Sequence, residues 1–207
     1  MNREYRISVV ARVGTVIFAA VTMAAIMNGC VNKNQSASDA HQLDSLMKTY
    51  AALKDSIDHE WEIMIADDDE CHGLMKRLLL EVSYTNNYDK DKFSELTGLV
   101  DRLKTMRYDQ KSMGNSAMID TYDSATFALS DQVIAYARNH PRYADFPLMA
   151  ELIDDINGKN NYILMHRIHY DNWVKELNAF IKKNRKKMLK TDPGLKMENM
   201  PLFELSS

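Results

Sequence analysis

The sequence predicts an all-α fold, an elongated antiparallel helical bundle with one long N-terminal helix. Glycine and proline are scarce, with 7 Gly and 4 Pro in 207 residues, and every proline lies beyond residue 140. A many-stranded fold needs more of these turn-forming residues. Residues that favour helices, such as Leu, Lys, Met, Ala and Glu, are abundant. The third observation is an apolar residue at every seventh position over residues 43–78.

The first 30 residues resemble a bacterial export signal. Three arginines precede an apolar or small-residue run over 13–27, which is the order of a secretory signal peptide. The run leads to Gly29-Cys30, and a Cys directly after a small residue is the feature that a lipoprotein signal requires. We therefore expect 1–29 to be cleaved as a signal peptide and Cys30 to carry a lipid. An uncleaved membrane helix over 13–32 and a core segment are the alternatives.

The remainder of the chain is long enough to form one domain with its own core. We divide it into a lipidated Cys and flexible polar spacer over 30–40, a helical bundle over 41–190 and a C-terminal tail over 191–207. The net charge of −3 is too small to indicate a nucleic-acid partner. Cys71 is the only thiol besides Cys30, so a lipidated chain has no internal disulfide.

A very long first helix is predicted between the spacer and Tyr84. Its apolar residues follow the seven-residue spacing of a coiled coil, with a second apolar position in each repeat. The first set is Leu43, Tyr50, Ile57, Met64, Cys71 and Leu78, and the second is Leu46, Leu53 and Leu74. Glu60 and Asp67 interrupt the second position, where we expect the buried stripe to broaden through Trp61 and Ile65. The Asn- and Thr-containing stretch from Tyr84 to Tyr88 ends the helix.

Two shorter helices are predicted next. The second helix begins near Asp89 or Asp91, and "DQKSMGNSA" from Asp109 separates it from a third helix over about 116–139. His140-Pro141 ends the third helix, because proline disfavours helix in the residue before it. The expected core residues are Phe93, Leu96, Leu99, Val100, Leu103 and Met106, then Ile119, Tyr122, Phe127, Leu129, Val133, Ile134 and Tyr136.

A fourth helix is predicted to open at Asp145-Phe-Pro147, with Asp145 as the N-cap and Pro147 in the first turn. Its apolar stripe is Leu148, Leu152, Ile156, Ile163, Tyr170, Val174, Leu177 and Ile181. We expect Asp192-Pro193-Gly194 to end the ordered part of the chain. The tail beyond carries Met197, Met200 and Phe203, which are apolar side chains suited to docking on the bundle or on a partner.

Several stretches resemble the LemA family of bacterial membrane-associated proteins. The strongest is "HPRYADFPLMAELIDDINGKNNYILMHRIHYDNWVKELNAFIKK" from His140, and "DSIDHEWEIM" and "EVSYTNNYDKDKFSEL" add weaker similarity upstream. The matching positions are Ile57, Asp58, Trp61, Pro141, Glu151, Leu152, Ile156, Gly158, Asn161, Tyr170, Asn172, Val174, Asn178, Leu202, Phe203 and Glu204. The chain departs from the family at Asp171, where Asn is usual, and around 73–77, where the family has a proline.

The resemblance implies a helical bundle without an established enzyme activity, so it carries over no catalytic residues. The family usually has an N-terminal membrane helix, whereas this chain offers Cys30 for lipidation. The chain therefore resembles a divergent, lipid-anchored member of this family.

Asp67, Asp68, Asp69 and Glu70 form an acidic band in the first helix. Consecutive residues fan around a helix axis, so these carboxylates cannot converge on one Ca²⁺, which needs six to eight oxygens from a folded loop. We expect a solvated band that pairs with basic residues on a neighbouring helix or on a partner.

A basic run closes the fourth helix. It consists of Lys182, Lys183, Arg185, Lys186, Lys187 and Lys190. Cations are favourable at any helix C-terminus, which is the simpler explanation. The functional alternative is contact with an acidic partner or with anionic lipid headgroups, where each cation contributes roughly 1 kcal/mol.

His166 and His169 lie three residues apart, so both imidazoles share one helix face as paired metal ligands require, and Asp171 follows. No partner helix shows the Glu-x-x-His pattern of di-iron proteins, so we expect no metal and no cofactor. A metal-dependent enzyme using these three residues is the alternative. Cys71 is expected to be inert packing. No phosphate-binding Gly loop and no Gly-x-Ser-x-Gly elbow occurs.

The sequence thus predicts a LemA-like, lipid-anchored helical protein that binds or scaffolds at the bacterial envelope and faces the periplasm. The expected contacts are the membrane through the lipid anchor and an envelope protein, with no nucleic acid. Self-association and a passive spacer without a specific partner are left open.

Overall fold

The computed structural model of the chain describes the backbone of residues 4–203 and the side chains of residues 39–203. Its elements are α1 (Glu4–Ser83), α2 (Lys90–Met106), α3 (Ser116–Arg138), the 3₁₀ helix η1 (Tyr143–Asp145) and α4 (Pro147–Thr191). No strand occurs in that part of the chain. The predicted all-α fold with a long N-terminal helix is confirmed.

The predicted signal peptide over 1–29 and Cys30 lie outside the residues whose side chains are described. Of the predicted spacer over 30–40, only Asp39 and Ala40 fall within that part, and both are helical. Among the described residues, no helix has a stretch that is both long and apolar enough to span a bilayer.

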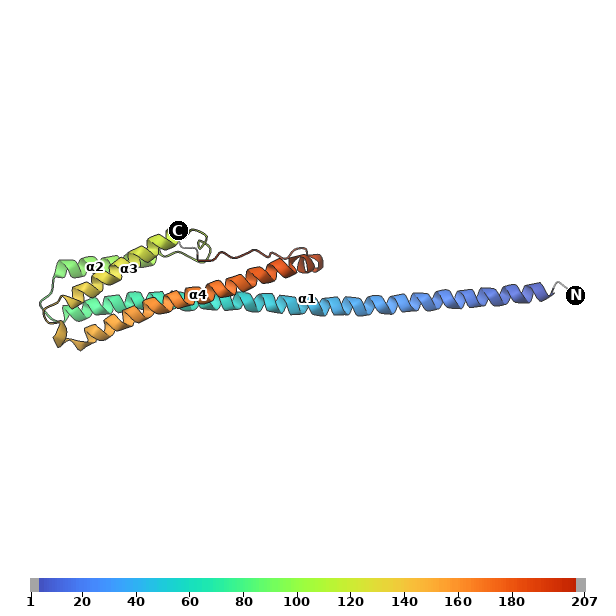
Figure 1. The fold of residues 1–207 in the computed structure, drawn as a ribbon, viewed down its shortest axis with the longest axis horizontal. Helices are drawn as coiled ribbons and strands as arrows, with labels where there is room; N and C mark the ends of the chain where they lie inside the picture. The colour runs from blue at the N-terminus through green and yellow to red at the C-terminus, as the bar shows by residue number, and fades with distance from the viewer. Residues whose placement is uncertain (1–3, 204–207) are drawn as a thin grey trace.

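The two long helices, α1 and α4, pack side by side in opposite directions (Figure 1). The contacts between side chains run in opposite directions along the two helices. Lys159 of α4 contacts Asp67, whereas Lys187, which lies 28 residues later, contacts Gln42. The seam consists of the apolar residues that the seven-residue pattern predicts, including the buried Ile57, Met64, Cys71 and Leu78. The predicted antiparallel arrangement is therefore confirmed for this pair.

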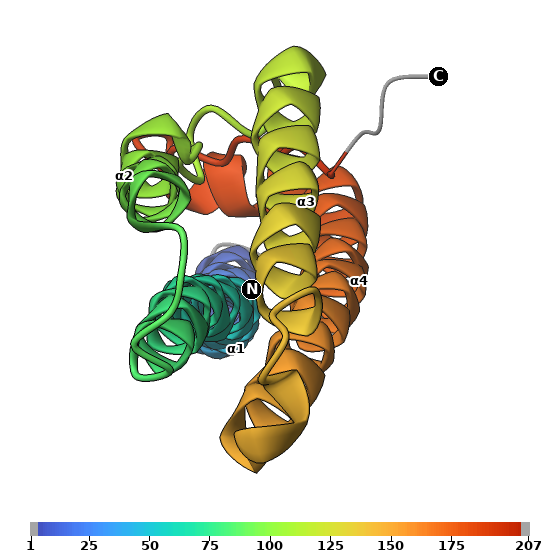
Figure 2. The ribbon, with the colours of Figure 1, turned by 90° about the vertical axis from the view of Figure 1, so that its left-hand side faces the viewer.

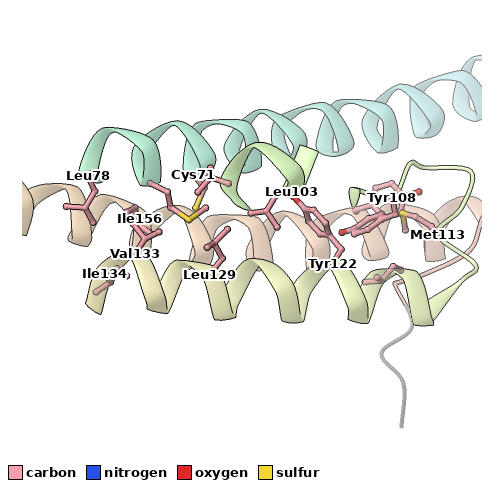
Figure 3. Packing of buried hydrophobic residues seen from close by; sticks show 14 of the residues in the cluster. Cys71, Leu78, Leu103, Tyr108, Met113, Tyr122, Leu129, Val133, Ile134 and Ile156 are labelled. Carbon is pink, nitrogen blue, oxygen red and sulfur yellow. The ribbon is translucent and has the colours of Figure 1, made fainter. Parts of the chain in front are cut away.

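The helices α2 and α3 cover the C-terminal half of α1 and complete a four-helix region there (Figure 1). In the end-on view, α2 and α4 flank α3 (Figure 2). Figure 3 shows that side chains from all four helices share one core, among them Cys71 of α1, Leu103 of α2, Leu129 and Val133 of α3 and Ile156 of α4.

Local sequence fixes most of the helix ends. The Asp89 carboxylate accepts hydrogen bonds from the backbone N–H groups of Asp91 and Lys92, which makes it the N-cap of α2 as predicted. Asn115 caps α3 in the same way through the Met118 N–H. The turn after α1 contains Asn86 at φ 59°, a left-handed conformation that Asn tolerates better than most residues.

The predicted N-cap of α4 is wrong. Asp145 lies in η1 and pairs with Arg142, and the N-cap position belongs to Phe146, whose side chain caps no backbone N–H. Pro147 occupies the first turn as predicted, because its missing N–H would lack an intrahelical partner there anyway.

Two predicted core residues are exposed, and two loop residues replace them. Phe127 of α3 is 45% exposed and Met106 ends α2 at the surface. Tyr108 and Met113, from the connection between α2 and α3, are buried instead. Helical periodicity cannot locate such residues, because it applies only within the helices themselves.

The tail is part of the packed structure, so the prediction that order ends at Gly194 is wrong. Met197 is 2% exposed, and the Asn178 side chain both donates to and accepts from the backbone of Met200 at 2.9 Å. The Phe203 N–H donates to Asp171 at 3.0 Å. The Phe203 ring lies 5.3 Å from that of Tyr170 and 6.5 Å from that of Trp61, between centroids.

Replacing Phe203 with Ala should lower the free energy of unfolding by about 2 kcal/mol, somewhat less than the loss for a fully buried Phe. The reason is the loss of ring contacts that join the tail to α1 and α4. Chemical denaturation of the full chain measures this. Phe127→Ala is the matched control and should change stability by less than about 0.5 kcal/mol, because its ring is largely exposed. Equal effects of the two substitutions would contradict the docked tail.

Candidate functional site

The residues of the acidic band Asp67–Glu70 pair with different neighbouring elements. Lys159 of α4 lies 2.7 Å from Asp67 Oδ1 and 2.6 Å from Glu70 Oε2. These hydrogen bonds raise the pKa of Lys159 and keep it charged. Glu70 remains exposed, whereas Asp67 is largely covered by α4. The predicted pairing with a basic residue on a neighbouring helix is therefore present in the structure.

Asp68 is only 5% exposed, so the prediction of a solvated band is wrong at this position. Its carboxylate accepts hydrogen bonds from Tyr122 Oη of α3 and, at 3.0 Å, from Arg107 Nη1 after α2. Arg107 also contacts Asp69 Oδ1 at 3.0 Å. Burial opposes the charge of Arg107, yet the hydrogen bond to Asp68 raises its pKa. A buried carboxylate is stable only when it is paired in this way.

His72 adjoins the same carboxylate, with its Nε2 atom 3.3 Å from Tyr122 Oη and 3.8 Å from Asp68 Oδ1. Burial lowers the pKa of His72, and the attraction of Asp68 opposes this only in part. Burial also raises the pKa of Tyr122, and the Asp68 charge adds to that effect. The group is thus a neutral His and Tyr around one paired carboxylate.

A second buried cation, Arg167, joins α4 to α3 and to the tail. Its guanidinium donates to both carboxylate oxygens of Asp123, and to Tyr108 Oη at 2.8 Å. The Arg167 Cζ atom lies 5.2 Å from the centroid of the Phe203 ring, within cation–π range. Burial disfavours the charge, but the hydrogen bonds to Asp123 raise the pKa of Arg167.

The two histidines of α4 meet a carboxylate of α1. Glu60 Oε2 lies 2.9 Å from His166 Nδ1, and Glu60 Oε1 lies 3.7 Å from His169 Nδ1. One ligand atom from each of these residues falls within 4.8 Å of the other two. His166 and Glu60 are largely buried between the helices, whereas His169 is about half exposed. A solvent-open hollow beside them is lined by Glu60, His169, Asn172, Trp173 and Glu176.

Asp171, the third residue of the predicted metal alternative, does not face the two histidines. It accepts the Phe203 N–H on another side of α4, and burial raises its pKa. Cys71 is fully buried, as expected for inert packing, and burial raises the pKa of its thiol to about 12. A thiol with such a pKa stays protonated and unreactive at neutral pH.

The basic run closes α4 and is exposed. All six members belong to the helix and all six are exposed, namely Lys182, Lys183, Arg185, Lys186, Lys187 and Lys190. Lys187 contacts the Gln42 side chain, which places this end of α4 beside the first described part of α1.

An apolar surface lies on the outside of α4. We call it the outer face and define it by Tyr162, Leu164, Met165 and Ile168, with Phe127 of α3 beside it. Ile168 is 62% exposed, the other three α4 residues are 40–52% exposed, and Leu164 and Phe127 line one shallow hollow. Core periodicity did not reveal this surface, because its residues lie outside the buried stripe.

Comparison with known proteins found no family model, no curated protein and no solved structure that matches the chain.

Sequence reasoning did not assign Glu60 or Arg167 to a site. Glu60 was visible as an interruption of the apolar seam, which is the signal of a polar contact across that seam. Arg167 stands in the α4 stripe between Ile163 and Tyr170, where a charged residue also signals a buried partner. The identity of each partner could not be inferred, because it comes from a distant part of the chain.

Replacing Arg107 with Met should lower the free energy of unfolding by about 3 kcal/mol, because it leaves the buried Asp68 carboxylate without its cation. Lys104→Met is the matched control. Lys104 pairs with Asp69 at the surface, so its loss should cost less than about 1 kcal/mol. Thermal or chemical unfolding of both variants measures the difference, and equal losses would contradict a buried Asp68–Arg107 pair.

Proposed function

We propose that the chain is a LemA-like protein of the bacterial envelope, anchored by a lipid on Cys30, that binds or scaffolds a protein partner on the periplasmic side of a membrane. The observation that carries the binding function is the exposed outer face of α4. Contiguous apolar surface of this kind is typical of protein interaction sites.

Several residues that carry the resemblance to the LemA family lie close together in the fold. Trp61, Tyr170 and Phe203 pack together, and Asn178 holds the backbone at Met200. Asp171, which differs from the usual Asn, still accepts a hydrogen bond from the tail.

The basic run fits a position near the membrane. Lys187 contacts Gln42, which follows Cys30 by 12 residues, so an anchored Cys30 lies at most about 40 Å along the chain from this contact. Cations held within reach of a bilayer are attracted to anionic headgroups. We therefore assign Lys182, Lys183, Arg185, Lys186 and Lys187 to headgroup contact.

The acidic band is a weaker candidate for a partner surface than the outer face. Asp67 and Asp68 are already paired within the chain, so a partner would have to displace Lys159 or Arg107. The outer face needs no such displacement, because its side chains are exposed. It also lies on the part of α4 before the basic run, which leaves it free when that run contacts the membrane.

A photo-crosslinking amino acid in place of Ile168, in the full chain in bacterial cells, should give discrete adducts with a protein in the membrane fraction. The control carries the same amino acid in place of Leu80, which is 46% exposed on α1 outside the outer face. Adducts from position 168 should exceed those from position 80 several-fold. A second copy of the chain as the adduct would identify self-association as the binding event.

Cys30→Ala tests the anchor in the same cells. The substituted chain should lose its membrane retention and its adducts, because both depend on the lipid. Equal labelling from positions 168 and 80 would contradict the binding surface. A Cys30→Ala chain that stays in the membrane fraction would contradict the lipid anchor and favour an uncleaved membrane helix.

A further inference from the structure

Glu60, His166 and His169 converge in the structure. The single hydrogen bond between Glu60 and His166 does not explain why His169 also faces the Glu60 carboxylate. His166 Nδ1 contacts one oxygen of Glu60 at 2.9 Å, which is a direct hydrogen bond or ion pair. His169 Nδ1 faces the other oxygen at 3.7 Å, which is too long for a hydrogen bond. Two imidazole nitrogens are thus directed at the two oxygens of one carboxylate.

These separations match the spacing of ligands around one small metal ion. Zn²⁺ binds His nitrogen and carboxylate oxygen at about 2.0–2.2 Å, so adjacent ligand atoms of a tetrahedral site lie about 3.4 Å apart. The distances of 2.9 and 3.7 Å lie on either side of that value, but they end on the two different oxygens of Glu60, so the carboxylate has to turn to present one oxygen to both nitrogens. All three ligand atoms fall within 4.8 Å of one another, so small side-chain rotations bring them onto one ion.

The surroundings of His166 fit the same role. Its other ring nitrogen, Nε2, lies 3.6 Å from Asp67 Oδ2. A carboxylate that accepts a hydrogen bond from the second nitrogen of a metal-binding His fixes the ring and its tautomer. At 3.6 Å Asp67 makes no such hydrogen bond, but Lys159 at 2.7 Å holds its carboxylate beside the His166 ring.

We propose that Glu60, His166 and His169 form a Zn²⁺ site that joins the middle of α1 to α4. Two imidazoles favour a transition metal over Ca²⁺ or Mg²⁺, which prefer oxygen ligands. Three protein ligands leave a fourth position for water on the side of the hollow lined by Asn172, Trp173 and Glu176. The ion adds a bond between the two long helices, next to the Asp67–Lys159 ion pair and the contact of Trp61 with Tyr170.

This site is independent of the proposed binding role of the outer face, and it has its own test. The full chain, purified in detergent and stripped of metal with a chelator, is titrated with ZnCl₂ by calorimetry. One ion per chain is expected, with a rise in Tm of about 5 °C when Zn²⁺ is present at roughly 100 times its Kd. Cys71 does not compete, because its buried thiol stays protonated.

His169→Ala is the decisive variant, because His169 is about half exposed and its removal leaves the core intact. It should bind Zn²⁺ at least about 10-fold more weakly and lose most of the Tm rise. His59→Ala is the matched control, an exposed His next to Glu60 that should bind as the unmodified chain does. The absence of stoichiometric Zn²⁺ binding, or equal affinity of the His169→Ala and His59→Ala chains, would overturn the site and leave an ion pair.

Discussion

Carboxylates in the middle of α1 set the main constraint on this structure. Glu60, Asp67 and Asp68 lie where α1 packs against its neighbours, and none of them is fully solvated. Each therefore requires a partner from another element, namely His166, Lys159 and Arg107. These pairs therefore fix the position of α2 and α4 along the axis of α1, in addition to the face of α1 on which they pack.

This requirement gives the α1–α4 pair a defined register. An apolar seam alone tolerates sliding by whole repeats, whereas a buried ion pair is lost when the helices slide. Arg167 acts similarly between α4 and α3, and its contact with Phe203 extends the same network to the tail. The basic run and the outer face of α4 keep fixed positions relative to α1 because that register is fixed.

The sequence predicted the features that depend on local pattern. The seven-residue repeat located the α1 seam, and Asp89 and Pro147 marked two helix starts. Phe127 and Asp145 were assigned wrongly, since an apolar or capping residue type does not determine which side of a helix is covered or where it begins. The pairing of Asp68 with Arg107, the position of the tail and the approach of Glu60 to His166 arise from contacts between distant segments, which periodicity does not encode.

The antiparallel register of α1 and α4 is tested most directly by distances between spin labels on the purified full chain. Labels at positions 42 and 187 should give a short distance, near the 8–10 Å between packed helices plus the label arms. Labels at 42 and 162 should be farther apart by roughly 35 Å, because 25 residues of helix rise about 1.5 Å each. A short 42–162 distance, or similar distances for both pairs, would contradict the account.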